Sequence, residues 1–348
     1  MTKHKGFFPP LDFARGHVEL GHGSGGRATA QLIEELFSAA FDNEWLRRMN
    51  DQAAFDPPPG RLVLTTDSFV VSPLFFPGGD IGSLAVHGTI NDIAMAAARP
   101  LYLSASFILE EGFPLADLRR IVHSMAAAAR AADVSIVTGD TKVVERGKGD
   151  GVFITTTGVG VVPPGADISA DRARPGDQIL LSGCIGDHGV AILSQREHLS
   201  FETALQSDSA ALHELVAAMI AAAPTMHCLR DPTRGGLAAV LNELAQQSQV
   251  GMVIRERDIP VRPAVAAACE FLGLDPLHIA NEGKLVAICP PDFAAAAVAA
   301  LRSHPLGKDA AIIGEVREDA QCFVEMQTDF GGNRLVDWLS SDPLPRIC

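Results

Sequence analysis

The sequence predicts an α/β protein of two domains, and three observations lead to this prediction. Its 348 residues are enough for two domains of ordinary size, each with its own hydrophobic core. Patterns typical of strands and of helices occur in both halves of the chain. Between the halves lies Pro163-Pro164-Gly165, and the polar stretch after it ends at Pro175-Gly176-Asp177, so we place the domain boundary here.

The first half begins with a glycine loop at residues 21–26 that opens a helix. The apolar residues of this helix share one face: Leu32, Ile33, Leu36, Phe37 and Phe41. Strands are expected at residues 61–66, 134–138 and 152–162, and a helix rich in small residues at 82–98. We expect a loop at Thr66-Asp67-Ser68 after the first strand, and Gly139-Asp140-Thr141-Lys142 to follow the second.

The second half repeats this mixture of elements. Strands are expected at residues 178–182, 285–288 and 311–316, and helices at 208–223, 237–245 and 292–303. The pattern does not say which strands pair. The predicted division is an N-terminal extension at 1–20, a first domain at 21–165, a second domain at 166–333 and a tail at 334–348.

The composition excludes some classes of function. A net charge of −14 argues against binding nucleic acid or an anionic membrane through bulk electrostatics. No apolar run approaches the roughly 20 residues of a membrane span, and the N-terminus lacks the apolar core of a signal peptide. We therefore expect a cytoplasmic protein.

The six cysteines show neither C-x-x-C pairs nor the spacing of a zinc site. The first five are expected to be small buried residues in a reducing compartment: Cys184, Cys228, Cys269, Cys289 and Cys322. The sixth, Cys348, ends a tail stiffened by Pro343 and Pro345. From the tail alone, a frayed end and an arm that carries one sulfur nucleophile between two sites are equally good interpretations.

The glycine loop matches the dinucleotide fingerprint only formally. Gly21-x-Gly23-x-x-Gly26 has the spacing, but no second strand with a terminal acidic residue follows the helix. As a phosphate-binding P-loop it has Arg27-Ala28 where Lys-Ser/Thr is required. Two interpretations are left open: a loop of backbone donors that suits an anion, and a purely structural turn.

Four aspartates lie at positions that suit a magnesium–nucleotide site: Asp67, Asp92, Asp140 and Asp231. Converging carboxylates with one lysine, here Lys142, commonly hold Mg²⁺ and nucleotide phosphates. The alternatives are a helix N-cap for Asp231, a turn for Asp140 and a hydrogen-bonded core carboxylate for Asp92. Their occurrence together with the glycine loop favours the magnesium–nucleotide interpretation.

Glu282 precedes a predicted buried strand and is a candidate general base facing a cleft. The alternative is a polar turn in which Glu282 pairs with Lys284 in solvent. His278 is kept as a possible neighbour of Glu282. The histidines have no metal-binding spacing, and the others, His188 among them, are interpreted as surface or structural residues.

Taken together, short segments along almost the whole chain resemble the HypE family of hydrogenase-maturation proteins, within the superfamily of aminoimidazole-ribonucleotide synthetase-like (PurM-like) ATP-dependent enzymes. The segments are His22-Gly23-Ser24-Gly25-Gly26, Thr65-Thr66-Asp67-Ser68, Leu74-Phe75-Phe76-Pro77-Gly78-Gly79, Asn91-Asp92, Phe107-Ile108-Leu109-Glu110-Glu111-Gly112, Thr138-Gly139-Asp140-Thr141-Lys142-Val143-Val144, Gly186-Asp187-His188-Gly189, Thr233-Arg234-Gly235-Gly236, Asn281-Glu282-Gly283-Lys284 and Pro345-Arg346-Ile347-Cys348. The terminal tetrapeptide is the most discriminating of them. Only the extension before Gly21 is left unexplained by the resemblance.

The resemblance implies a two-domain PurM-like fold of the α/β (α+β) class. Its N-terminal mixed sheet would form a barrel in a homodimer, and its C-terminal α/β domain would be followed by a flexible tail. It also implies an ATP- and Mg²⁺-dependent carbamoyl dehydratase. A HypF-type carbamoyltransferase would load the Cys348 sulfur, dehydration would turn the thiocarboxamide into a thiocyanate, and a HypC–HypD scaffold would accept the cyanide for [NiFe]-hydrogenase.

The same resemblance implies roles for individual residues. Cys348, Glu282 and Lys142 would be catalytic. The nucleotide would be bound by Gly23, Ser24, Gly25, Gly26, Asp67, Asn91, Thr138, Gly139, Asp140, Thr141 and Arg234. The metal would be held by Asp67, Asp92, Asp140 and Asp231.

Two alternatives stay open from the sequence. The first is another ATP-dependent synthetase of the superfamily, such as selenophosphate synthetase, although the first cysteine here is Cys184, far from the glycine loop. Purine-ring closure, a related activity, would leave Cys348 without a role. The second is a non-catalytic nucleotide-binding scaffold whose tail only docks on a partner.

Overall fold

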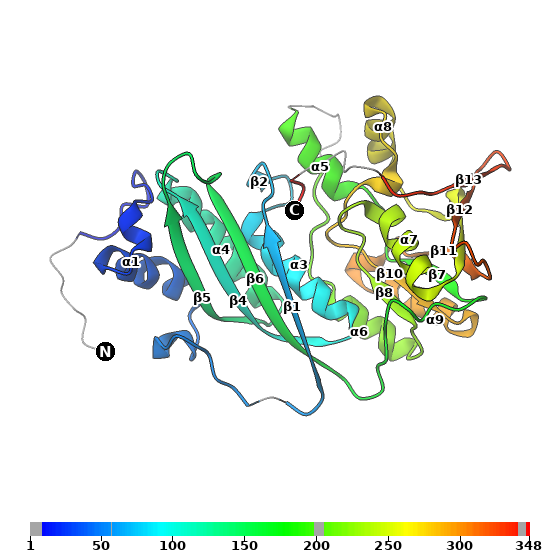
Figure 1. Cartoon of the computed structure of the whole chain (residues 1–348), viewed down its shortest axis with the longest axis horizontal. Helices are drawn as coiled ribbons and strands as arrows, with labels where there is room; N and C mark the ends of the chain where they lie inside the picture. Colours follow the sequence, from blue (N-terminus) through cyan, green and yellow to red (C-terminus); the bar gives the residue numbers. More distant parts are fainter. Residues whose placement is uncertain (1–8, 57, 198–204, 340–345) are drawn as a thin grey trace.

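The computed structural model describes residues 9–56, 58–197, 205–339 and 346–348. Two sheets, each with helices packed on it, lie side by side along the long axis of the molecule (Figure 1). The C-terminal end of the chain lies between them, near β2 (Phe75–Phe76) and α5 (Asp187–Arg196) (Figure 1). Within the described ranges, every helix is too short or too polar to span a bilayer.

The first sheet has four strands in the order β1-β6-β4-β5. Its strands are β1 (Arg61–Phe69), β4 (Arg99–Glu110), β5 (Ser135–Val144) and β6 (Val152–Val162). The β4–β5 pair is parallel and the other two pairs are antiparallel. The sheet is therefore mixed, as predicted.

Two helices, α3 (Ile81–Met95) and α4 (Leu115–Ala131), pack against one face of this sheet. The small residues of α3 permit close packing, since a Cβ at Gly82 would lie 2.3 Å from the carbonyl oxygen of Ile121 in α4. The opposite face exposes Leu62 and Leu64, which are 52% and 71% accessible. This second face of the sheet is called the open face below.

The glycine loop leads into a helical segment, as predicted. This segment and the elements next to it are η1 (Leu20–Gly23), α1 (Arg27–Leu32), a π-helical stretch η2 (Ile33–Ser38), α2 (Ala39–Phe41) and η3 (Leu46–Arg48). Elsewhere, β2 (Phe75–Phe76) and β3 (Gly79–Asp80) form a small antiparallel sheet that contacts α5 and α3. Leu32, Leu36 and Phe37 are buried against the first sheet and α4. The predicted apolar face is thus confirmed.

The second sheet has seven strands in the order β13-β12-β9-β11-β7-β10-β8. Its strands are β7 (Gln178–Leu181), β8 (Cys228–Arg230), β9 (Gly251–Arg255), β10 (Val286–Cys289), β11 (Ala311–Arg317), β12 (Val324–Gln327) and β13 (Asn333–Leu335). One face packs on α7 (Gly236–Ser248), and the other on α6 (His213–Ala222) and α9 (Pro291–Ser303). Helices on both faces are the arrangement expected of an α/β layer.

The remaining elements connect or flank the sheets. They are α5 (Asp187–Arg196), η4 (Glu256–Asp258), α8 (Pro263–Leu272), η5 (Pro276–His278) and η6 (Pro305–Gly307). All strands of the first sheet precede residue 163 and all strands of the second follow residue 177. The predicted boundary at residues 165–166 lies in this connection.

The predicted loop at residues 66–68 and the predicted strand end at residue 138 are wrong, because in both places the strand continues. β1 extends through Asp67 and Ser68 to Phe69, paired with β6 throughout. β5 begins at Ser135 and includes Asp140 and Lys142, paired with β4. Polar side chains are tolerated in these strands because both are edge strands of the sheet.

The tail begins later than predicted. Arg334 and Leu335 belong to β13, which pairs with β12, and Val336 is buried. Pro343 and Pro345 lie outside the described residues, as do residues 1–8 of the N-terminal extension. The rest of the extension is ordered against the first domain, where Val18 is buried and His17 bridges to Pro114.

Candidate functional site

A cavity of about 710 Å³ lies between the two sheets and is lined by charged residues. Asp67 comes from β1, Asp92 from α3, and Asp231 from the loop after β8. Arg230 and Arg234 line the same cavity. The structure therefore brings together three of the four predicted metal ligands, with the predicted nucleotide residue Arg234.

The three aspartates influence one another electrostatically. Burial, followed by the charge of Asp92, raises the pKa of Asp231 to about 7. Burial also raises the pKa of Asp67 and of Asp92, although each accepts one hydrogen bond, from Ser68 N–H at 2.8 Å and from Thr65 Oγ1 at 2.7 Å. Such a cluster of carboxylates binds a cation favourably, because the cation removes their mutual repulsion.

The cluster fits a metal that arrives with phosphates better than a bare ion. Among the described residues, no group of three or more His, Cys, Asp or Glu side chains is close enough to hold a metal by itself. Mg²⁺ commonly takes one or two protein carboxylates and completes its shell with water and substrate phosphates. The arginines at the rim of the cavity suit the remaining phosphate oxygens.

Glu282 lies next to this cluster and is 3% accessible. A Cβ at Gly88 of α3 would lie 2.9 Å from the ring of Phe69 and 4.0 Å from Glu282 Oε2, so these three residues meet. The pKa of Glu282 is raised well above its usual range, by burial first and then by the charge of Asp231. A buried carboxylate with a raised pKa is a suitable proton acceptor once it is ionised.

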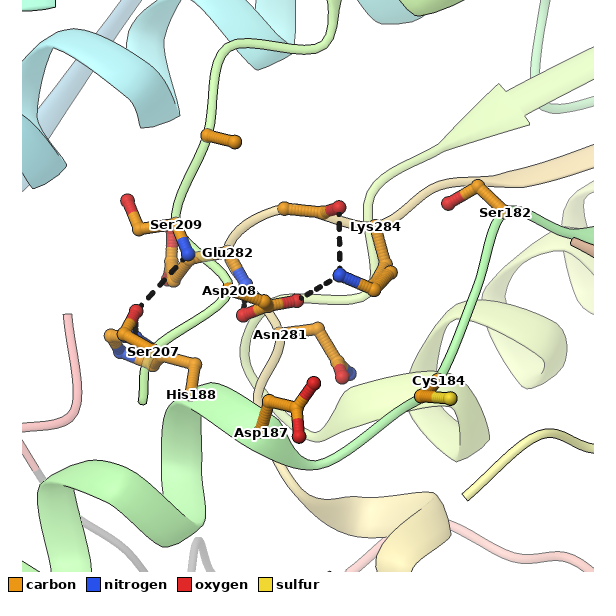
Figure 2. A network of polar contacts seen from close by, with 12 residues as sticks. Ser182, Cys184, Asp187, His188, Ser207, Asp208, Ser209, Asn281, Glu282 and Lys284 are labelled. Atoms are coloured by element: carbon orange, nitrogen blue, oxygen red, sulfur yellow. Dashed lines mark hydrogen bonds and ion pairs between the residues drawn. The ribbon is translucent and has the colours of Figure 1, made fainter. Parts of the chain in front are cut away.

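A buried ion pair supports the main chain at Glu282. Asp208 accepts the Glu282 N–H at 3.1 Å through one carboxylate oxygen and Lys284 Nζ at 2.8 Å through the other (Figure 2). The alternative of a solvent-exposed pair between Glu282 and Lys284 is therefore wrong. Lys284 pairs with Asp208 instead, and both side chains are buried.

Asn91 also holds this loop in place. Its Nδ2 donates to the carbonyl oxygens of Ala210 at 3.0 Å and Glu282 at 3.1 Å, and its Oδ1 accepts the Leu212 N–H at 2.8 Å. With both amide atoms used, Asn91 fastens α3 to the Glu282 loop. Its predicted contact with the nucleotide stays a prediction.

The described end of the tail, Arg346 to Cys348, is docked on the main chain that follows β1. Val70 N–H donates to the main-chain oxygen of Cys348 at 3.2 Å, and Ser72 N–H to that of Arg346 at 3.2 Å. Ile347 is buried in the core of the first domain. Since Val70 follows Phe69, whose ring meets Gly88 and Glu282, Cys348 is attached at the edge of the same site.

Side chains clamp the docked tail from two directions. Arg196 Nη2 donates to the main-chain oxygens of Ser72 at 2.7 Å and Arg346 at 2.9 Å. Arg346 forms an ion pair with Asp150 and donates to the Val70 oxygen at 3.1 Å. The frayed end considered from the sequence is thus not what the structure shows for residues 346–348.

Asp140 and Lys142 lie elsewhere in the chain, on β5. Lys142 Nζ is 2.6 Å from Asp140 Oδ2, and this exposed pair lowers the pKa of Asp140. Asp67 and Gly139 lie in the same row of paired residues, which runs across all four strands of the sheet. Three strand spacings separate them, so their main chains are about 14 Å apart. Asp140 belongs to the next row and therefore points to the open face, whereas Asp67 points to the covered face.

The glycine loop lies with Asp140 and Lys142 rather than with the three clustered aspartates. A Cβ at Gly23 would lie 2.5 Å from the Val143 N atom, so the loop packs directly on β5. Beside it, Thr138, Gly139, Asp140 and Thr141 line a pocket of about 150 Å³ under the N-terminal helices. Within one chain, the predicted nucleotide and metal residues therefore form two separate groups.

Sequence reasoning missed three residues that hold the site together: His188, Asp208 and Lys284. Their partners are distant in sequence, and His188 contacts the tail 159 positions away. No local pattern predicts such a contact. His278, the expected neighbour of Glu282, is influenced instead by Asp275 and Arg334, and burial lowers its pKa.

Two models of known protein domains match this chain, one in each half. Residues 49–162 match the N-terminal domain of AIR synthase related proteins, and residues 174–327 match the C-terminal domain of that family. Over 338 residues the chain is 71% identical to carbamoyl dehydratase HypE of Azotobacter vinelandii, covering 97% of this chain and 99% of that protein.

Solved structures of similar proteins superpose over most of the chain. A structure of the hydrogenase maturation protein HypE in complex with ATP has a TM-score of 0.92 and 53% identity, covering 95% of this chain and 99% of the other. A structure of a HypE–HypF complex has a TM-score of 0.79 and 52% identity, covering 88% and 99%.

Proposed function

The chain belongs to the HypE family of carbamoyl dehydratases, and from this premise we propose that it dehydrates a carbamoyl group carried on its own Cys348 sulfur. It is an enzyme of hydrogenase maturation. The observation that carries the proposal is the docked tail. Cys348 is hydrogen-bonded to Val70, the residue after Phe69, and both the Phe69 ring and Glu282 lie beside Gly88 of α3. Asp67, two residues before Phe69, lines the acidic cavity.

The chemistry requires an activated oxygen, because an amide oxygen is a very poor leaving group. The carbamoyl oxygen takes the γ-phosphoryl group of ATP, and ADP leaves. The nitrogen gives up its protons, for which Glu282 is the proposed acceptor, and the C–O bond then breaks as phosphate departs with its electron pair. S–C(=O)NH₂ becomes S–C≡N, and the oxygen lost from carbon leaves in the phosphate.

Mg²⁺, when bound, would offset negative charge on the transferring phosphoryl group. Asp67, Asp92 and Asp231 are the proposed ligands, with Arg234 on the phosphates. The support is their shared cavity, together with burial, which raises the pKa of each of the three, and the charge of Asp92, which raises the pKa of Asp67 and Asp231 further. Metal binding requires their ionised forms, and so we expect Mg²⁺ to lower these pKa values.

The direct test is the mass of the tail peptide. Incubation with carbamoyl phosphate, ATP and a HypF-type carbamoyltransferase is expected to add the mass of HNCO to Cys348, and ATP then removes one water. A protein that gains the carbamoyl group but never loses water in the presence of Mg²⁺ and ATP would contradict the proposed reaction.

Asp92→Asn is expected to weaken Mg–ATP binding by about 10- to 100-fold, because it removes one charge from the cation site while the side-chain shape is kept. Isothermal titration calorimetry measures the affinity. Asp292→Asn, at an exposed position on α9, is the matched control and should bind as the wild type does. Unchanged affinity in Asp92→Asn would remove Asp92 from the site.

A homodimer is the proposed assembly, formed through the open face of the first sheet. This face carries exposed Leu62 and Leu64 beside paired hydroxyls, including Thr66 with Thr157 at 2.9 Å. Neighbouring exposed leucines on an otherwise uncovered sheet face are compatible with an interface. A two-fold axis parallel to the strands places the β5 edge of one copy beside the β1 edge of the other.

In such a dimer, Asp140, Lys142 and the glycine loop of one copy would complete the site that contains Asp67 and Asp92 of its partner. Mixed dimers test this. A dimer of one Asp92→Asn chain and one Lys142→Ala chain keeps one intact site, so about half of the wild-type activity is expected although both homodimers are inactive. Two different N-terminal tags would isolate the mixed dimer. If Lys142 serves its own chain, mixed dimers would be as inactive as the parents.

The proposed partners are a HypF-type carbamoyltransferase as the source of the carbamoyl group and a HypC–HypD scaffold as the acceptor of cyanide. The likeness to HypE in a HypE–HypF complex supports the first. The tail must leave its docked position to meet either of them. A reducing cytoplasm is the proposed compartment, consistent with free thiols at Cys228, Cys269 and Cys289.

A further inference from the structure

His188, in the first turn of α5, is completely buried, and both of its ring nitrogens have hydrogen-bond partners. Nδ1 lies 2.8 Å from Ser207 Oγ, and Nε2 lies 2.8 Å from the main-chain oxygen of Ile347. The ring also contacts the edge of Phe76 in an approximately perpendicular arrangement. His188 is thus held from three sides, and one of its partners belongs to the docked tail.

The partners determine which nitrogen carries the proton. The Ile347 oxygen can only accept, so His188 Nε2–H donates to it. Burial lowers the pKa of His188, so that the ring is neutral and Nδ1 accepts from the Ser207 hydroxyl. Ser207 Oγ in turn accepts the Ser209 N–H at 3.1 Å. Ser209 N–H thus donates to Ser207, and the Ser207 hydroxyl donates to His188 Nδ1. The proton of the ring is therefore on Nε2, which donates to the Ile347 oxygen of the tail.

The segment that orients His188 also positions Glu282. Asp208 follows Ser207 and accepts the Glu282 N–H, and Ala210 N–H donates to the Glu282 oxygen at 3.4 Å. Figure 2 shows Ser207 beside His188 and Asp208 beside the Glu282 loop. One short stretch of chain thereby supports both the residue that contacts the tail and the proposed proton acceptor.

On the basis of the proposed function, we propose that His188 is a positioning residue that fixes the main chain of the docked tail, and with it the Cys348 sulfur, in register with Glu282. The donor acts on the carbonyl of the peptide bond that leads directly into Cys348. A fixed peptide plane determines where the next Cα and its side chain lie. Ser207 contributes by selecting the tautomer that donates.

Two substitutions separate the hydrogen bond from the packing. His188→Leu removes the donor, whereas His188→Gln keeps an amide N–H near the position of Nε2. In single turnover, with the tail already carbamoylated, His188→Leu is expected to lose water on the order of 10- to 100-fold more slowly, and His188→Gln to recover most of the rate. ATP affinity should stay within about twofold in both, since the donor acts on the tail rather than on the nucleotide.

A second readout follows the tail itself. Alkylation of Cys348 by iodoacetamide, measured by peptide mapping with Cys322 as the internal reference, should accelerate in His188→Leu and much less in His188→Gln. His123→Leu and His123→Gln, on an exposed position of α4, are the matched controls and should match the wild type. If His188→Leu does not fold, Ser207→Ala tests the same contact, with a smaller loss of rate and faster alkylation expected.

The outcomes distinguish the two proposals. Wild-type turnover and alkylation rates in both His188→Leu and Ser207→Ala would overturn the role of His188. Equal losses in the Leu and Gln variants, without faster alkylation, would show that only packing matters and would overturn it as well. Failure of the wild type to lose water after carbamoylation would contradict the proposed function itself.

Discussion

Cys348→Ala is expected to abolish every mass change on the tail while Mg–ATP binding stays within about twofold of the wild type. The sulfur is both the attachment point and the carrier of the product, so no other residue can take its place. The proposed metal ligands Asp67 and Asp231 line a cavity whose lining does not include Cys348, so Mg–ATP binding should not depend on the thiol. Intact-mass spectrometry and calorimetry on the same sample measure both quantities.

Cys322→Ala is the matched control for this substitution. Cys322 is partly exposed, like Cys348, but lies on the second domain between β11 and β12. The Cys322→Ala variant should still take a carbamoyl group on Cys348 and form thiocyanate at the wild-type rate. If Cys348→Ala still supported cyanide transfer to a HypC–HypD scaffold, the chain would act as a nucleotide-binding scaffold rather than as the carrier.

Glu282→Gln is expected to slow the loss of water by about 10²- to 10⁴-fold, the usual contribution of a general base, so that the carbamoylated form accumulates. The amide keeps the shape of the side chain and cannot accept the nitrogen proton. Because burial, and then the charges of Asp231 and Asp208, disfavour an ionised carboxylate here, the neutral amide should leave the midpoint of thermal unfolding equal or higher at pH values where Glu282 would be ionised. A mutant that lost water at the wild-type rate would show that Glu282 is not the base.

The pH dependence supplies an independent check on Glu282. Its raised pKa means that the carboxyl group binds a proton at pH values where an ordinary glutamate is ionised. The rate of the dehydration step in the wild type is therefore expected to fall as the pH is lowered through that raised pKa. In Glu282→Gln this part of the pH profile should be absent, whereas in Glu325→Gln, on β12, it should be retained.

Local patterns predicted the elements whose burial alternates regularly. Residues 152–162 form β6 as expected, since alternate side chains face the core. Asp67 was expected in a loop after the strand at 61–66, and Asp140 just after the strand at 134–138. Both lie within strands instead, because edge strands can expose acidic side chains to a cavity or to solvent. The acidic cluster followed from residue type and position, and three of its four members do meet.

The sequence could not reveal how strands are ordered in the sheet. The order β1-β6-β4-β5 places Asp67 and Asp140 on strands at opposite edges, and nothing local specifies this separation. The contacts of His188 and Asp208 likewise depend on tertiary packing between distant segments. Long-range contacts therefore account for most of what was missed.

The tail is held largely by its peptide groups. The main-chain oxygens of Arg346, Ile347 and Cys348 all accept hydrogen bonds, from Ser72, His188 and Val70 respectively. These contacts use main-chain oxygens and not the sulfur, so we expect them to be the same for the thiol, the thiocarboxamide and the thiocyanate. If the affinity of this site for the tail is the same for all three forms, tail binding does not favour the forward reaction over the reverse. ATP hydrolysis therefore drives the reaction forward, whereas docking of the tail only brings the Cys348 sulfur of each form to the same position.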